Sequence, residues 1–121
     1  MIKRIFVLDD NLDILEFIKE ALQYENFEVF CTSNCDNVIV TIQKYQPDLI
    51  ILDYKLNGPN GDDICKRIKI NPELGNVPVI ICSAYLNENA CGLDCDCDAF
   101  IAKPFGLEEL LDKVNTLITA E

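Results

Sequence analysis

Three short apolar runs in the sequence end directly in polar side chains. The runs, each with the polar residues that follow it, are 5–8 with Asp9 and Asp10, 49–52 with Asp53, and 79–82 with Ser83. A fourth run, 100–102, ends at Lys103. In a parallel α/β sheet the carboxyl ends of the strands open on one edge, where ligands bind. The sequence therefore predicts that three carboxylates, a hydroxyl and an ammonium converge there, a set suited to a divalent cation and a phosphoryl group.

Length and composition predict a single folded domain over residues 1–121. The chain has 121 residues, near the common size of one domain. Hydrophobic residues make up 50% of it, which is enough for a full core and argues against disorder. We therefore expect no second folded unit in this sequence.

The net charge of −11 at pH 7 limits the partners of the chain. Nucleic acids bind proteins through Lys and Arg contacts with phosphates, so direct DNA or RNA binding is disfavoured. A strongly acidic surface instead suits cationic partners and metal ions. No stretch approaches the ~20 apolar residues of a membrane helix, and the apolar run after Arg4 is too short for a secretory signal. We expect a cytoplasmic protein with no membrane or nucleic-acid partner.

The chain contains seven cysteines, an odd number. In the reducing cytosol such residues are most simply free thiols that pack as small apolar side chains. Cys91, Cys95 and Cys97 stand among aspartates, so the alternative is a soft-metal site. That segment lacks the C-x2-C pairs of zinc sites and the chain has no His. We therefore predict structural cysteines without bound zinc or iron.

Apolar runs alternate with segments of helical periodicity, a rhythm typical of βαβ units. The predicted strands are 3–8, 28–31, 48–52, 77–82 and 99–102, and the clearest predicted helices are 12–24, 62–70 and 107–119. Another helix is predicted to be capped by Ser33 or Asn34 and to end at Gln46, because Pro47 cannot continue it. Residues 84–98 support a helix only weakly. In the last helix, the residues expected to face the core are Leu107, Leu110, Leu111, Val114, Leu117 and Ile118.

Several short motifs stand in order at the ends of the predicted strands. They are Leu8-Asp9-Asp10-Asn11, Leu52-Asp53, Ser83-Ala84 and Lys103-Pro104-Phe105, with Gly61 eight residues after Asp53. Over the whole chain they resemble the receiver domain of two-component response regulators, in particular the single-domain chemotaxis regulators. The resemblance implies an α/β fold of the three-layer, doubly wound (βα)5 flavodoxin-like type, with a five-stranded parallel sheet in the order 2-1-3-4-5.

By this resemblance Asp53 is the phosphoryl acceptor, a role that fits the ability of a carboxylate to act as a nucleophile. The resemblance also implies Mg²⁺ as cofactor. Asp10 and Asp53 would be direct ligands, Asp9 would act through water, and the carbonyl of Lys55 would be a further ligand. Mg²⁺ prefers oxygen ligands and keeps several waters, so a site with few carboxylates suits it. The alternative for Asp9 and Asp10 is a capping pair at the helix over 12–24, a role that can coexist with metal binding.

Lys103 resembles the family lysine that pairs with the acceptor aspartate and then with phosphoryl oxygens, as an ammonium opposite an anion can do. Ser83 and Phe100 resemble the two parts of a switch: the phosphoryl group draws the hydroxyl, and the aromatic ring fills the space that opens. The alternative for Phe100 is an ordinary core aromatic. The resemblance further implies a cis peptide bond between Lys103 and Pro104.

The sequence is thus interpreted as a phosphoacceptor response regulator in a two-component phosphorelay, and as a monomer or weak dimer. It is expected to take a phosphoryl group from a sensor histidine kinase or a histidine phosphotransfer protein onto Asp53 and to signal to an unidentified downstream protein. We expect catalysis only of its own phosphorylation and dephosphorylation, because a phosphatase would need an added acid/base and a substrate cap. The alternative is a pseudo-receiver that binds partners without phosphorylation. A flavin carrier is disfavoured, because Asp9 and Asp10 would repel its phosphate.

Overall fold

The structure, a computed structural model, describes residues 2–56, 58–84 and 97–119. Its elements in chain order are β1 (Arg4–Leu8), α1 (Leu12–Tyr24), β2 (Glu28–Thr32), α2 (Val38–Tyr45), β3 (Leu49–Asp53), α3 (Gly61–Ile70), β4 (Val79–Ser83), β5 (Ala99–Ala102) and α4 (Leu107–Thr119). The predicted bounds of α1, β5 and α4 are confirmed, and those of the other predicted strands and of α3 differ by one or two residues. The weakly supported helix within 84–98 falls mainly on residues outside this description. Among the described residues, no helix has the length and apolarity needed to cross a bilayer.

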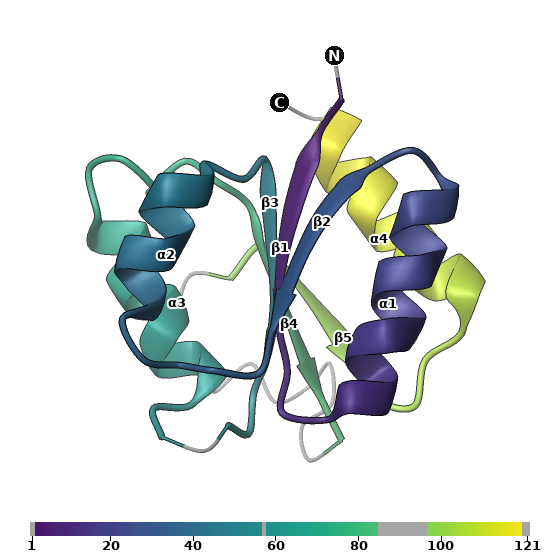
Figure 1. Cartoon of the computed structure of the whole chain (residues 1–121), viewed down its shortest axis with the longest axis horizontal. Helices are drawn as coiled ribbons and strands as arrows, with labels where there is room; N and C mark the ends of the chain where they lie inside the picture. Colours follow the sequence, from purple (N-terminus) through teal and green to yellow (C-terminus); the bar gives the residue numbers. More distant parts are fainter. Residues whose placement is uncertain (1, 57, 85–96, 120–121) are drawn as a thin grey trace.

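The five strands form one parallel sheet in the order β2-β1-β3-β4-β5, which confirms the predicted order 2-1-3-4-5. Within the described part of the chain, two helices cover each face: α1 and α4 lie on one side of the sheet, and α2 and α3 lie on the other (Figure 1). This three-layer arrangement is the doubly wound flavodoxin-like fold. β2 lies on one side of β1, and β3 lies on the other side, so the strand order reverses at β1. Ligand sites of such folds lie beside this point.

The apolar runs of the strands are uninterrupted because helices cover both faces of the sheet. Successive residues of a strand point to opposite faces of the sheet. Leu49 and Ile51 of β3 join the core cluster under α1 and α4, whereas Ile50 and Leu52 join the cluster under α2 and α3. All four side chains are almost completely buried. Both faces of β3 therefore need apolar residues, and the first polar side chain stands where the strand ends.

Local capping fixes where two helices begin beside the strand ends. The side chain of Asn11 accepts hydrogen bonds from the backbone N–H of Asp13 at 2.9 Å and of Ile14 at 3.2 Å, so α1 starts immediately after the turn that follows β1. At the start of α3, Gly61 N–H donates to the carbonyl of Tyr54 at 2.7 Å. These bonds hold the residues that follow β1 and β3 in fixed positions at the same edge of the sheet.

The predicted cap of α2 is wrong. The residue before α2 is Asn37, which has a left-handed backbone (φ 53°) and makes no capping bond with its side chain. Asn34 instead accepts a hydrogen bond from the N–H of Asp36 at 2.8 Å, and Thr32 accepts one from the N–H of Asn34 at 3.1 Å. These side chains build a turn rather than a helix end, which delays α2 until Val38. The predicted end of α2 at Gln46 is confirmed, since Gln46 is its C-cap.

Two further expectations are corrected by the structure. β4 begins at Val79 rather than at residue 77, because Val77 N–H donates to the carbonyl of Leu74 in the preceding turn and Pro78 has no N–H to donate. The sequence predicts that Leu107 faces the core, but its side chain is 47% exposed. The first turn of α4 lies beside α1, where Leu107 lines a groove instead of reaching the sheet.

Gly61→Ala is expected to lower the free energy of unfolding by ~1–3 kcal/mol. A Cβ on Gly61 would overlap the backbone carbonyl oxygen of Asp53, so either α3 or the end of β3 would have to shift. Gly106→Ala is the matched control, because a Cβ at Gly106 meets open space, and it should change stability by less than ~1 kcal/mol. Urea unfolding measures both variants. Equal effects would contradict the close approach of α3 to β3.

Candidate functional site

The carboxyl ends of the strands meet at the lower edge of the sheet in Figure 1. The ladders place Leu8 opposite Leu52 and Ser83 opposite Ala102, so the residues that follow these pairs come together. A pocket of about 290 Å³ opens at this edge. Its lining residues are Asp9, Asp10, Asn11, Ile14, Asp53, Lys55, Ala84 and Lys103. The acidic pair, the expected acceptor and both expected lysines therefore share one pocket, as the sequence predicts.

Lys103 joins two buried carboxylates of this pocket. Its Nζ donates to Oδ2 of Asp9 at 2.9 Å and to Oδ1 of Asp53 at 3.0 Å. The side chains of Lys103, Asp9 and Asp53 are 13%, 3% and 11% exposed, respectively. Ion pairs removed from water are screened by salt much less than surface pairs. One ammonium thus links the polar residues that follow β1, end β3 and follow β5.

The two aspartates after β1 are held differently. Oδ1 of Asp9 accepts from the backbone N–H of Asn11 at 2.9 Å, and Oδ2 accepts from Lys103, so both oxygens of Asp9 have protein partners. Oδ1 of Asp10 is buried and has no hydrogen-bond partner among the described residues. A buried carboxylate oxygen without a partner is unfavourable, which suits Asp10 to a further ligand. The helix-capping role considered for this pair is filled by Asn11.

Opposing effects act on the pKa values of the central ion pair. Burial raises the pKa of Asp53, and the carboxylates of Asp9 and Asp10 raise it further, against the lowering effect of Lys103. Burial alone would lower the pKa of Lys103, but its hydrogen bonds to Asp9 and Asp53 and their charges outweigh burial and raise it. Lys103 is therefore an ammonium at neutral pH. The ionised form of Asp53 is unfavourable in the pocket and would be stabilised by an additional cation.

The donor set of the pocket fits a hard divalent cation. Mg²⁺ takes oxygen ligands, commonly binds through one or two carboxylates and keeps several waters. No three acidic or thiol side chains within residues 2–56, 58–84 and 97–119 form a group that could hold a metal by themselves. Asp10 and Asp53, together with a backbone carbonyl and water, provide a ligand set of the size that Mg²⁺ uses. A softer metal would find no sulfur or imidazole among the described residues that line the pocket.

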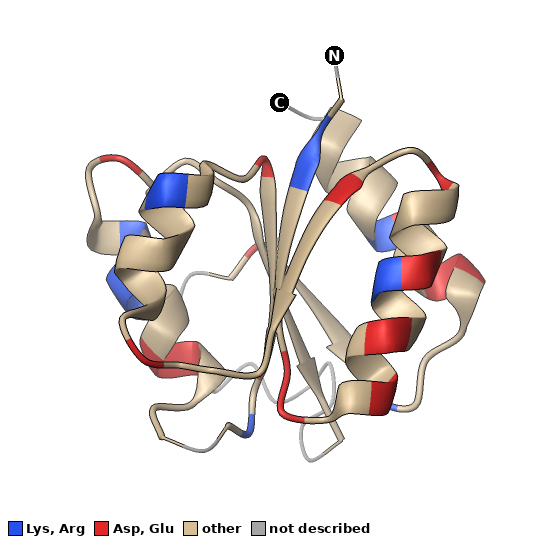
Figure 2. Ribbon diagram, viewed as in Figure 1, with Lys and Arg blue, Asp and Glu red and all other residues tan. Residues whose placement is uncertain are grey.

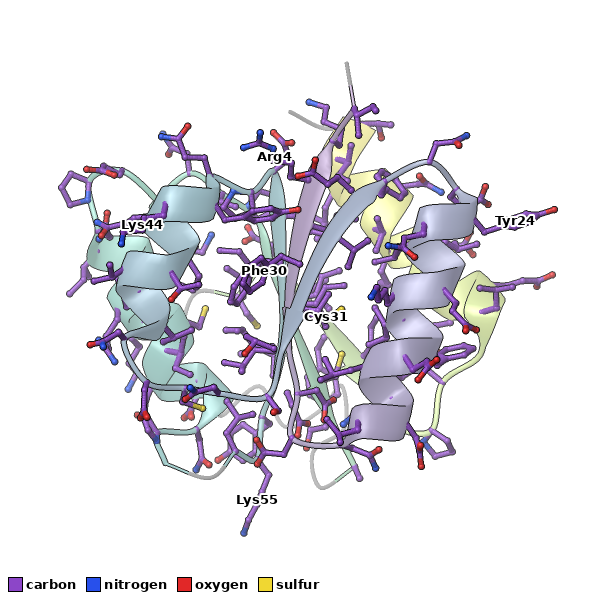
Figure 3. All side chains as sticks on the ribbon, viewed as in Figure 1. Arg4, Tyr24, Phe30, Cys31, Lys44 and Lys55 are labelled. Atoms are coloured by element: carbon purple, nitrogen blue, oxygen red, sulfur yellow. The ribbon has the colours of Figure 1, made fainter. Side chains whose placement is uncertain are left out.

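The remaining predicted site residues lie at or beside the pocket. Ser83 ends β4 and is buried, and its carbonyl accepts from the N–H of Lys103 at 2.8 Å. Phe100 lies in β5 and is half-buried against the core cluster under α2 and α3. Lys55 is exposed and extends from the edge of the sheet into solvent (Figure 3). The predicted cis peptide bond between Lys103 and Pro104 is confirmed.

Three lining residues were not among the predicted site residues. Asn11 could have been found from sequence, because it directly precedes the apolar periodicity of α1 as a capping residue does. Ala84 directly follows Ser83 in the motif at the end of β4, whereas Ile14 carries no chemical signal and only the fold brings it to the pocket.

The described cysteines fit the structural role that the sequence predicts. Cys31 and Cys82 carry free thiols in or against the core cluster under α1 and α4. Burial raises the pKa of Cys82 to about 12 and also raises the pKa of Cys31. A thiol with a raised pKa is a poor nucleophile at neutral pH. Cys91 and Cys95 lie outside the described residues.

A family model described as the response regulator receiver domain matches residues 5–115. This chain belongs to the response regulator receiver domain family. The chain is 31% identical over 120 residues to the phosphate regulon transcriptional regulatory protein PhoB of Rhizobium meliloti, a match that covers 98% of this receiver domain and 53% of PhoB. It thus spans about half the length of that curated relative.

Two solved structures show the same fold. The receiver domain of a signal transduction histidine kinase from Syntrophus aciditrophicus is 25% identical, with a TM-score of 0.88 over 98% of this chain and 91% of that chain. The receiver domain of sensor histidine kinase PA1611 from Pseudomonas aeruginosa PAO1 is 20% identical, with a TM-score of 0.88 over 98% of this chain and 99% of that chain. The PA1611 structure has a magnesium ion coordinated in its active site cleft.

Asp53→Asn is expected to raise the free energy of unfolding of the metal-free receiver domain at pH 7. The pKa of Asp53 is higher in the folded chain than its ordinary value of about 3.9, so the ionised carboxylate destabilises the fold above that pH. The gain should disappear below about pH 4, where the wild-type carboxyl is protonated in both states. Chemical unfolding in EDTA measures this difference. Asp112→Asn, at an exposed site on α4, is the control. A loss of stability in Asp53→Asn at pH 7 would contradict the raised pKa of Asp53.

Proposed function

We propose that this receiver domain accepts a phosphoryl group on Asp53 from the phosphohistidine of a sensor histidine kinase or a histidine phosphotransfer protein. Mg²⁺ is the proposed cofactor, and the readout is a conformational change recognised by a downstream protein. The observation that carries the proposal is the pocket in which Lys103 bridges Asp9 and Asp53 while Asp10 keeps a buried oxygen without a protein partner.

In the proposed reaction an oxygen of the Asp53 carboxylate attacks the phosphorus atom of the phosphohistidine. The new P–O bond forms as the P–N bond breaks, and the electron pair leaves with the imidazole nitrogen, which takes up a proton. Asp53 is suited to this attack because it is the last residue of β3, a strand buried on both faces, and its side chain lines the open pocket. A rigid strand end fixes the position of the nucleophile.

Charge repulsion is the main obstacle to this reaction. Two like charges ~4 Å apart repel by on the order of 4 kcal/mol at an effective dielectric constant of 20, and the pocket already contains three carboxylates. We propose that Lys103, which lies 3.0 Å from Asp53, shifts its hydrogen bond to an oxygen of the arriving phosphoryl group. Its attachment to Asp9 keeps the ammonium in place during that exchange.

The proposed Mg²⁺ ligands are Asp10 and Asp53, with the carbonyl of Lys55, and Asp9 acts through water. The bonding of the two neighbouring aspartates supports this division, because both oxygens of Asp9 are already engaged and Oδ1 of Asp10 is not. The magnesium ion in the PA1611 receiver domain supports the choice of metal. When bound, Mg²⁺ supplies positive charge against the carboxylates and the phosphoryl oxygens.

Ser83 and Phe100 are the proposed switch. Ser83 ends β4 beside the pocket and Phe100 lies in the adjacent strand β5, where residues 81 and 100 pair. In this proposal the hydroxyl of Ser83 moves to donate a hydrogen bond to the phosphoryl group. The half-buried ring of Phe100 then turns inward, and β5 presents a different surface to the downstream protein.

We propose that the receiver domain acts in the cytoplasm and catalyses only its own phosphorylation and dephosphorylation, with no chemistry on other substrates. A pseudo-receiver would not need the arrangement seen here. Gathering three carboxylates in one pocket, two of them bonded to Lys103, is unfavourable for a module that only binds partners.

Incubation with acetyl phosphate and Mg²⁺ should add one phosphoryl group to the wild-type protein, stable in acid and sensitive to hydroxylamine. Asp53→Asn retains the size of the side chain but loses the nucleophile, and it should abolish labelling. Asp112→Asn, the exposed control, should be labelled at the wild-type rate. Intact-mass spectrometry measures the three proteins. Labelling of Asp53→Asn at the wild-type rate would exclude Asp53 as the acceptor.

Asp10→Asn should weaken Mg²⁺ binding more than Asp9→Asn, because a direct ligand contributes more than one acting through water. We expect a loss of about tenfold for Asp9→Asn and of about a hundredfold or more for Asp10→Asn. Calorimetric titration of each variant with Mg²⁺ tests this order. Equal and weak effects would indicate that the pair has only a structural role at the start of α1.

A further inference from the structure

β2 forms one edge of the sheet, and that edge is open. In the order β2-β1-β3-β4-β5 it has a neighbouring strand on one side only. The other side faces the viewer in Figure 1, between α1 and α2. Each of the five residues of β2 is exposed or only partly buried, whereas all five residues of β3 and of β4 are buried. β2 is therefore accessible to another chain along its whole length.

Two hydrogen bonds fix which backbone groups of β2 are used by β1. Glu28 N–H donates to the carbonyl of Lys3 at 2.9 Å, and the carbonyl of Thr32 accepts from the N–H of Asp9 at 3.2 Å. The ladder between these two bonds is parallel and in continuous register. Glu28, Thr32 and the residue midway between them therefore direct their backbone groups toward β1.

The two remaining residues of β2, Val29 and Cys31, direct their N–H and C=O groups away from β1. Within the described part of the chain, no strand lies on that side. A row of such groups is a template for a further strand. In an antiparallel pair, facing residues of this kind exchange two hydrogen bonds, and such pairs recur at every second residue. The spacing of Val29 and Cys31 meets this requirement.

β2 lacks the features that usually protect an edge strand. Natural edge strands carry Lys, Pro or a bulge that prevents pairing with another chain, and β2 has none of these. Its one charged residue, Glu28, stands at its start and lies 3.2 Å from Arg4 of β1. Figure 2 accordingly shows β2 without charge beyond its first residue. The composition of β2 thus favours pairing on both sides.

Phe30 places an exposed aromatic ring at the centre of this edge. The residue is 38% exposed. Its ring stacks on that of Phe6, with centroids 5.4 Å apart, and contacts the ring of Tyr45 at 5.3 Å. Figure 3 shows Phe30 on the side of β2 that faces α2 and Cys31 on the side that faces α1. A ring that is already held in place loses little conformational entropy on binding.

We propose that β2 pairs antiparallel with β2 of a second copy of this chain, which joins the two sheets into one. The two-fold axis passes beside Phe30, so Phe30 faces Phe30 of the second copy and Val29 faces Cys31. Both residues with outward backbone groups are then hydrogen-bonded. The two exposed rings lie on the same face of the joined sheet and cover each other.

The sequence of β2 matches itself in this register, which favours a second copy over an unrelated strand. Glu28 faces Thr32 of the second copy, so like charges do not face each other, and every other facing pair is uncharged. Two chains of net charge −11 repel each other as a whole, and salt screens that repulsion. The dimer should therefore tighten as salt is added, whereas a complex held by opposite charges would weaken.

The test measures wild-type protein from about 10 µM to 1 mM, without Mg²⁺ or a phosphoryl donor, so its outcome is independent of the proposed phosphoacceptor function. Sedimentation should show a monomer–dimer equilibrium. Hydrogen exchange followed by NMR should show the amides of Val29 and Cys31 exchanging at least about tenfold more slowly at the highest concentration. The amide of Phe30 bonds to β1 within the chain, so it is the internal control and should be protected throughout.

Two opposite substitutions at Thr32 test the register. Thr32→Lys places a cation opposite Glu28 of the second copy and should tighten the dimer about fivefold, whereas Thr32→Glu should weaken it about fivefold. Both variants lose the same hydroxyl contact with the N–H of Asn34, and urea unfolding at low concentration checks that both are folded. Thr116→Lys and Thr116→Glu make the same charge changes on α4, which packs against β3 and β5, and should alter the dissociation constant less than about twofold.

Four results would overturn the proposal. They are a monomer at every concentration, a dimer whose newly protected amides lie outside β2, slow exchange of Val29 and Cys31 that does not depend on concentration, and a change in the same direction for both Thr32 variants.

Discussion

The ion pairs of Lys103 with Asp9 and Asp53 are the interaction on which the site depends. The fold brings three carboxylates to one edge of the sheet, where they repel one another, and Lys103 is the cation that the described structure places between two of them. Lys103 reaches that position because β5 is the neighbour of β4 and ends at the same edge. The order of the strands therefore determines which charged side chains lie together at this edge.

This arrangement compensates the charge only in part. The pKa of Asp53 stays above its ordinary value although an ammonium lies 3.0 Å away, because burial and the two neighbouring carboxylates outweigh that ammonium. A site of this kind is stabilised by any additional cation. The same electrostatics thus supports both the divalent-metal binding and the reactivity that we propose for Asp53.

The strand ends and the residues that meet there could be predicted from the sequence. Both faces of the inner strands are buried, so polar residues stand only where these strands end. The apolar runs before Asp9, Asp53 and Ser83 marked the strand ends, and the motifs there indicated the family and the sheet order. The roles of single atoms could not be predicted in this way. That Asp9 uses both oxygens within the protein while Asp10 leaves one without a partner depends on the turn that Asn11 makes.

The wrong predictions for the start of α2 and for the burial of Leu107 have equally local causes. The start of α2 was misplaced because Asn34 can either cap a helix or build a turn, and only the geometry of residues 32–37 decides between them. Leu107 has the spacing of a core residue, yet the first turn of α4 lies beside α1 and leaves it exposed. Leu107 instead lines a groove between α1 and α4, although periodicity alone would assign it to the core.

One short segment contacts both the phosphoacceptor pocket and a side chain of the groove between α1 and α4. Lys103 binds the carboxylates of the pocket, and Phe105, two residues later, packs against Phe17 in the wall of the groove. The chain thus places the central cation of one site and a supporting ring of the other within three consecutive residues.

The most direct test of the central account is the rate of phosphoryl incorporation from acetyl phosphate as a function of Mg²⁺ concentration. The account predicts no labelling of Asp53 in EDTA and a saturable rise whose midpoint matches the Mg²⁺ dissociation constant measured without the phosphate donor. Labelling of Asp53 at an undiminished rate in EDTA would show that neutralisation of this carboxylate cluster by metal is not required, and would contradict it.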